Sequence, residues 1–157
     1  MDKRIRFKRT LLKVASPSLQ SLGYEFVELP EWAGVGSFFF RKHLGNNVYA
    51  FISFDLLRWH PSSSGAESMP RRFRVTLWRN IGDQPKLGYG DDSYEGWLNV
   101  PLSYLLWAML GIKVYPSQYY QWEFFTSENL EVQLRDAVEK LVQYGIPWLE
   151  NPASRNP

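Results

Sequence analysis

The residues best placed to do chemistry lie along one predicted strand at positions 71–80. Arg72, Arg74 and Trp78 are separated by even numbers of residues, and successive side chains of a strand point to opposite faces, so these three share one face. Arg58 could join them from a neighbouring strand. A surface of arginine and tryptophan can bind a partner protein, or it can bind single-stranded nucleic acid by base stacking and phosphate contact.

The alternate positions of the same strand are apolar: they are Phe73, Val75 and Leu77. One face of this strand therefore belongs to a core, and the other is polar and carries an indole ring. That alternation predicts an antiparallel sheet with one covered face and one open face. The alternative is that a loop covers Trp78 while the arginines pair with carboxylates on neighbouring strands.

A second candidate site lies in the glycine-rich segment 81–99, which we expect to be a long loop. It carries carboxylates at Asp91, Asp92 and Glu95. Carboxylates in a glycine-rich loop are typical of calcium and magnesium sites, but the alternating ligand order of a calcium loop is missing. Together with Asp55 they could supply an acid–base pair, although nothing in the sequence brings two of them together. We therefore expect an acidic surface loop and no metal site.

Other patterns of catalytic or cofactor-binding proteins are absent from the sequence. There is no cysteine, and neither His43 nor His60 has a second ligand at zinc spacing. No metalloprotease helix, nucleophile elbow, phosphate loop or dinucleotide fingerprint occurs. The sequence predicts no cofactor and favours a non-catalytic protein-interaction module. The alternative is an enzyme or small-ligand binder that uses segment 81–99.

Length and composition indicate one domain. The chain has 157 residues, of which 45% are apolar and 17% aromatic, and a chain of this length can bury one sizeable core. No apolar run approaches the roughly 20 residues that span a bilayer, and the first residues lack the apolar region of a signal peptide. We expect a cytoplasmic protein with no membrane span; its oligomeric state is left open.

The net charge of +2 conceals a basic start. Residues 1–13 have a net charge of +5, so the rest of the chain is mildly acidic at −3. A basic helix can contact phosphates or an anionic membrane. Charge runs on helix faces are usually solvated, however, so we expect these side chains to face solvent. The basic residues are Lys3, Arg4, Arg6, Lys8, Arg9 and Lys13.

The closing helix, predicted at 128–144, has the clearest pattern in the chain. Its apolar residues recur at spacings of three and four and form one stripe, which needs an apolar surface to cover. Ser127 is the expected N-cap, and Gly145 is expected to end the helix in the left-handed conformation before Pro147. The stripe consists of Leu130, Leu134, Ala137, Val138 and Leu141.

The other elements complete an α+β prediction for a single domain, 1–157. We expect an antiparallel sheet of about four to six strands, with the N- and C-terminal helices packed on one face. The sequence Gly45-Asn46-Asn47 is typical of a hairpin turn, and residues 151–157 are expected to fray. The expected helices are 4–22, which Ser16-Pro17 could interrupt, and 100–110; the expected strands are 24–29, 35–42, 48–59, 71–80, 112–115 and 119–125.

These features resemble a family of bacterial domains of unknown function. In that family an opening helix ends in Leu-Gly-Tyr or Leu-Gly-Phe, a strand meander follows, and a closing helix ends in Gly-x-Pro. The resemblance implies an α+β fold and a bacterial source, and it brings no catalytic residues. It is carried by Leu19-x-x-Leu22-Gly23-Tyr24-x-Phe26, by Phe38 to Arg41, by Phe73-Arg74-Val75-Thr76-Leu77 and by Gly145-Ile146-Pro147-Trp148-Leu149-Glu150.

Overall fold

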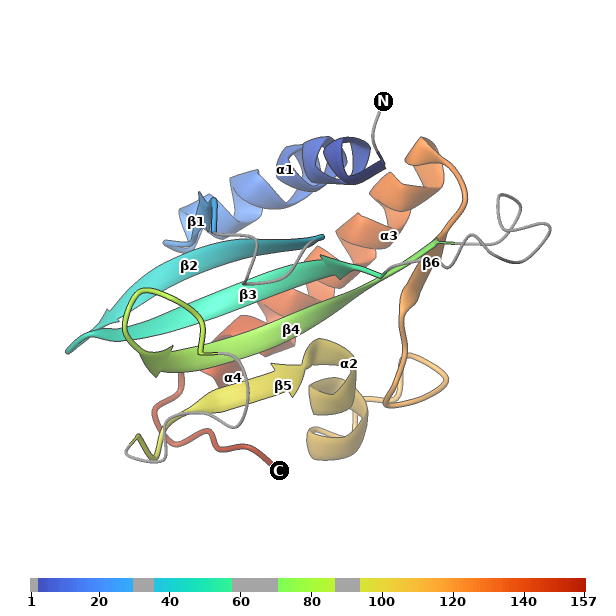
Figure 1. Cartoon of the computed structure of the whole chain (residues 1–157). Coiled ribbons are helices and arrows are strands. Elements are labelled where there is room, and N and C mark those ends of the chain that lie inside the picture. Colours follow the sequence, from blue (N-terminus) through green and yellow to red (C-terminus); the bar gives the residue numbers. More distant parts are fainter. Residues whose placement is uncertain (1–2, 30–35, 58–70, 87–93) are drawn as a thin grey trace.

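Six antiparallel strands form one sheet in this computed structural model, which describes residues 3–29, 36–57, 71–86 and 94–157. The strand order is β1-β2-β3-β4-β5, and β6 also pairs with β4 (Figure 1). The α+β fold predicted from the sequence is confirmed. The strands are β1 (Glu25–Val27), β2 (Ser37–Gly45), β3 (Val48–Leu56), β4 (Arg71–Ile81), β5 (Leu98–Pro101) and β6 (Trp122–Phe124).

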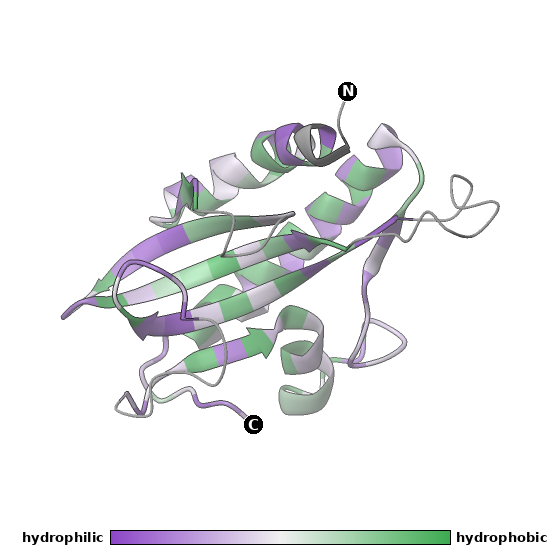
Figure 2. Cartoon of the chain, viewed as in Figure 1, coloured by the Kyte–Doolittle hydropathy of each residue, from purple (hydrophilic) through white to green (hydrophobic). Residues whose placement is uncertain are grey.

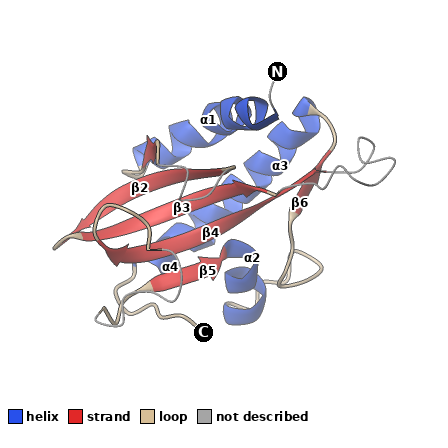
Figure 3. Cartoon of the chain, viewed as in Figure 1, coloured by secondary structure: helices blue, strands red, loops and turns tan. Residues whose placement is uncertain are grey.

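The helices lie at the two ends of the chain and after β5. The opening helix α1 and the closing helix α3 lie on the same face of the sheet, as predicted (Figure 3). The helical elements are α1 (Lys3–Ser21), α2 (Leu102–Tyr104), the π-helical turn η3 (Leu105–Met109), α3 (Ser127–Lys140), the π-helical turn η4 (Leu141–Gly145) and α4 (Ile146–Glu150).

The central strands β2, β3 and β4 form a continuous ladder. The turn between β2 and β3 follows the sequence prediction: Gly45, Asn46 and Asn47 all have positive φ, at 106°, 53° and 61°. Glycine and asparagine tolerate this conformation best. The next ladder runs from Val48 opposite Ile81 to Leu56 opposite Phe73, so β3 and β4 are paired along the whole length of β3.

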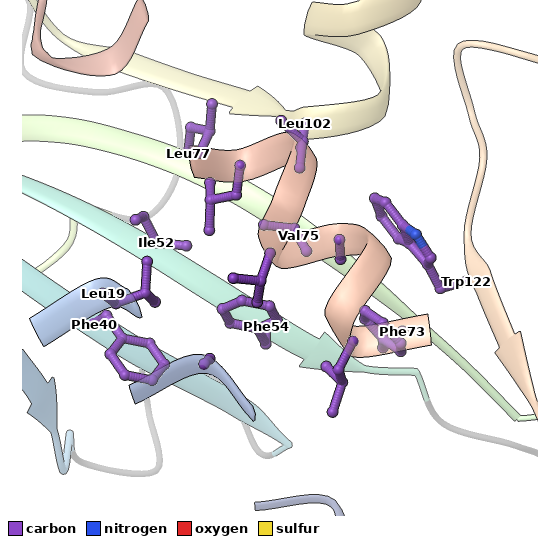
Figure 4. Close-up of a cluster of buried hydrophobic side chains, with 14 of the residues drawn as sticks. Leu19, Phe40, Ile52, Phe54, Phe73, Val75, Leu77, Leu102 and Trp122 are labelled. Carbon is purple, nitrogen blue, oxygen red and sulfur yellow. The ribbon is translucent and has the colours of Figure 1, made fainter. Parts of the chain in front are cut away.

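The main core lies between this sheet and the two long helices. The apolar face of β4 behaves as predicted: Phe73, Val75 and Leu77 are at most 1% exposed. Figure 4 shows them in one cluster with Phe54 of β3 and Phe40 of β2. The stripe of α3 and the inward residues of α1 close this core; they are Leu130, Leu134, Ala137, Val138 and Leu141 from α3 and its continuation, and Phe7, Leu11, Val14, Ala15 and Leu19 from α1.

The ends of the two long helices differ in part from the prediction. Thr126, and not Ser127, caps α3, because its Oγ1 accepts a hydrogen bond from the Asn129 amide at 3.0 Å. Gly145 has an ordinary helical φ of −68°, and the helix continues through η4 into α4. The π-helical turn places Pro147 in the first turn of α4, where its missing amide proton is tolerated.

Gly145 serves packing and does not end the helix. It is buried, and a Cβ atom built there would lie 3.0 Å from Leu102 Cδ1 and 3.1 Å from Leu141 Cδ1. At the other end of the chain, α1 runs through Pro17 without a break and stops before Gly23, whose φ is +91°. The predicted end of the opening helix is therefore confirmed, and the predicted interruption is absent.

The prediction and the structure differ most in the region after β4. Val100 belongs to β5, which is hydrogen-bonded to β4, and the helix begins only at Leu102. Residues 112–115 form no strand, and only Trp122–Phe124 of the last predicted strand pair with β4. Short apolar segments fit a buried helix and a buried strand equally well, and the pairing partner decides between them.

The chain after α4 makes several hydrogen bonds to residues of the sheet, which the sequence did not indicate. Arg79 of β4 is 2% exposed, and its guanidinium donates to the backbone carbonyls of Leu149, Asn151 and Ser154 at 2.7–2.8 Å. The Asn156 side chain also accepts a hydrogen bond from the Asn99 amide at 2.9 Å. A buried arginine with carbonyl partners holds this end of the chain in place.

Candidate functional site

The predicted binding residues of β4 lie on the sheet face opposite α1 and α3, which we call the second face. Arg72 and Arg74 have side chains that are 50% and 52% exposed, and Trp78 is half-buried. Figure 2 shows hydrophilic and hydrophobic residues alternating along β4. Arg58, which we expected to join this set, lies outside the described residues.

Both arginines pair with carboxylates on neighbouring strands, as the alternative interpretation anticipated. Arg72 lies opposite Glu123 of β6, and its Nη2 is 3.0 Å from Glu123 Oε1. Arg74 lies opposite Asp55 of β3, and its Nε is 3.3 Å from Asp55 Oδ2. The pairs fix the guanidinium groups in place while half of each side chain stays in contact with solvent.

Asp55 is the centre of a polar network on the second face. The residue is only 8% exposed. Its Oδ2 accepts hydrogen bonds from Ser53 Oγ at 3.3 Å and Thr76 Oγ1 at 3.1 Å, in addition to the contact with Arg74. The Trp78 indole nitrogen donates to Ser53 Oγ at 3.1 Å. Through Ser53, this carboxylate links the guanidinium of Arg74 to the indole of Trp78.

A small aromatic cluster packs against the Trp78 ring. Phe39 of β2 and Phe51 of β3 are 2% and 0% exposed on this face. The ring centroids of Phe39 and Trp78 are 6.3 Å apart, at an interplanar angle of 54°. The sequence contained a signal for this second cluster, since Phe38, Phe39 and Phe40 are consecutive and must point to both faces of their strand.

Arg41 and His43 add a second basic and aromatic group that the sequence did not reveal. Both lie on β2 beside Tyr49 of β3. The His43 ring stacks on Tyr49 with centroids 4.6 Å apart, and the Arg41 guanidinium lies 5.7 Å from the Tyr49 ring centroid. Arg41 also pairs with Glu25 at 3.2 Å. Alternation within β2 places Arg41 and His43 on one face, but Tyr49 and Glu25 join them only through the pairing of β1, β2 and β3.

Of the three carboxylates predicted in loop 81–99, the structure describes only Glu95. Asp91 and Asp92 lie outside the described residues. Glu95 is exposed and lines a cavity of about 530 Å³ together with Tyr94, Arg79 and Glu150. Arg79 gives this cavity little binding capacity, because its nitrogens donate to four backbone carbonyls. Burial lowers the pKa of the Arg79 guanidinium from its ordinary value, although arginine remains protonated in proteins.

The described residues offer no group of three metal-binding side chains. Among the helices described, none has the length and apolar character needed to cross a bilayer. Comparisons with protein-family models, curated proteins and solved structures found no match. The resemblance to a bacterial domain family therefore stays a prediction, and the candidate sites are judged on their geometry.

Proposed function

We propose that this protein is a non-catalytic interaction module that binds a partner protein through the second face of its sheet. The observation that carries the proposal is the network of Asp55, which holds an exposed guanidinium and an indole in fixed positions. Arginine and tryptophan are enriched among the residues that dominate binding energy. Side chains that are already ordered lose less conformational entropy on binding, so a fixed pair is a good anchor.

The charges on this face indicate the chemistry of the partner. The hydrogen bond to Asp55 uses Nε of Arg74, and an arginine has four further N–H groups on its two terminal nitrogens. Arg72 and Arg41 place two further guanidinium groups on this face, and each is paired with one carboxylate, Glu123 and Glu25. A partner that presents carboxylates around an apolar centre would match this arrangement, because guanidinium groups bind carboxylates in bidentate geometry.

A site-specific crosslink tests the proposal. A photoreactive phenylalanine at position 72 should crosslink one protein in a lysate of the source cell, and the same residue at position 132 should not. Val132 is 63% exposed and lies on α3, on the far side of the sheet, so it is a matched control. The captured protein is then identified, purified and titrated against the intact chain by calorimetry.

The titration decides whether the face carries the binding energy. Arg74→Gln should weaken binding by about tenfold or more, the loss expected for a central arginine. Arg135→Gln should leave affinity unchanged within about twofold, because Arg135 lies on α3 with its side chain 62% exposed. Equal affinities for both variants, with intact melting curves, would overturn the proposal.

Single-stranded nucleic acid is the competing occupant of the same face. An oligothymidylate titrated at several salt concentrations separates the two. Tight binding that falls steeply with salt would indicate phosphate contacts and would replace the protein partner.

A further inference from the structure

One basic residue from the start of the chain and one from β4 line the same cavity, which neither stretch indicates alone. The cavity measures about 300 Å³ and lies where the first turns of α1, the start of β4 and the start of α3 come together. Figure 1 shows these three segments at the same end of the molecule. Arg6 of α1 and Arg71 of β4 both line it. It shares no residue with the network of Asp55.

The walls of this cavity combine two kinds of chemistry. Phe7 and Leu130, at 1% and 4% exposed, provide an apolar floor that is continuous with the main core. Phe125 at the rim is 68% exposed, which is unusual for a phenylalanine. The cationic groups stand beside this apolar surface, and the lining residues that the structure describes include no carboxylate.

We propose that this cavity binds a small organic carboxylate with an apolar tail. The two guanidinium groups would hold the carboxylate, since arginine matches the geometry of that group. The apolar floor and the ring of Phe125 would cover the tail. The volume is at the lower end of the roughly 300–1,000 Å³ typical of ligand pockets, so a short tail fits better than a long one.

Calorimetric titration with sodium octanoate tests both halves of the proposal. Octanoate should bind one site per chain. Acetate, which has the head alone, and octylammonium, which has the tail with the opposite charge, should bind at least about tenfold more weakly. If octylammonium binds as well as octanoate, the site is a non-selective apolar surface and the proposal is wrong.

Substitutions locate the bound octanoate. Arg6→Gln and Arg71→Gln should each weaken octanoate binding by about tenfold, the factor expected for one lost charge-assisted hydrogen bond. Arg9→Gln is the matched control for Arg6→Gln. It removes the same charge from an exposed position of the same helix, but Arg9 is not among the residues that line the cavity. An equal loss in the Arg9 variant would show that net charge alone attracts the anion, which would overturn the proposal.

A cavity-filling substitution gives a test that leaves both arginines in place. Thr10 lines the cavity from α1 and is only partly buried, so Thr10→Phe should fill the space without disturbing the core. The variant should keep its melting temperature and lose octanoate binding. Unchanged octanoate affinity in this folded variant would place the ligand elsewhere and refute the proposal.

Discussion

The two faces of the sheet bury their side chains in different ways. On the helix-covered face, α1 and α3 seal a large apolar core around Phe73, Val75 and Leu77. On the second face, a small cluster around Phe39 and Phe51 lies beside a network of polar groups. The first arrangement stabilises the fold mainly through buried apolar area. The second also holds polar side chains at the surface in defined positions.

The buried charges of the described residues show the same contrast. Arg79 points from β4 toward the helix-covered side and donates hydrogen bonds to backbone carbonyls, so its donors are occupied by the protein itself. Asp55 on the second face is neutralised in part by Arg74, whose side chain is half exposed. The donors of Arg79 are therefore used within the fold, whereas the ion pair of Asp55 leaves part of the Arg74 side chain in contact with solvent.

The largest effect is expected at Arg79. Arg79→Leu fills similar space but leaves several buried carbonyls without a donor, and each such group costs about 1–3 kcal/mol, so the loss of unfolding free energy should be roughly 4 kcal/mol or more. Urea denaturation measures it, and hydrogen exchange should show faster exchange in residues 151–157. A loss below about 1 kcal/mol would mean that solvent replaces the arginine at little cost.

Two adjacent phenylalanines of β2 compare the faces directly. Phe40 faces the helices and contacts the rings of Phe26 and Phe54, while Phe39 belongs to the small cluster. Phe40→Ala should cost about 3–5 kcal/mol of unfolding free energy, and Phe39→Ala roughly 2 kcal/mol, because a small cluster can collapse around the cavity. Equal losses of unfolding free energy in chemical denaturation would show that the small cluster contributes as much to stability as the main core.

Asp55→Asn tests the network on the second face. The substitution preserves shape but removes the charge that Arg74, Ser53 and Thr76 contact, and it should cost about 1–2 kcal/mol of unfolding free energy. Because Trp78 bonds to Ser53, its indole fluorescence should also change. Thr76→Val in a double-mutant cycle with Asp55→Asn should reveal a coupling energy; purely additive losses would show that the groups act independently.

The smallest effect is expected at Arg72. Its ion pair with Glu123 is about half exposed, and such pairs contribute little, so Arg72→Ala should change stability by no more than about 0.5 kcal/mol. Its effect on partner binding should be larger than its effect on thermal melting. A clear drop in melting temperature would assign Arg72 to the fold rather than to the surface.

Much of the local structure was predictable because backbone geometry fixes it. Alternation along 71–80 correctly divided β4 between its two faces, and the stripe of Leu130, Leu134 and Ala137 identified the helix that covers the core. The glycine and asparagines of the β2–β3 turn were recognised because few residues tolerate positive φ. In each case the informative residues are close in sequence, so one strand or one helix contains the whole signal.

The tertiary structure decided everything that depends on residues far apart in the sequence. Asp55 meets Arg74 because β3 and β4 pair in one register, and Arg6 and Arg71 line one cavity because the first turns of α1 lie beside the start of β4. Arg79 appeared in the sequence as one more basic residue near the end of a strand, yet the returning chain buries it. Side-chain periodicity determines which face a residue occupies; strand register and helix packing determine what it meets there.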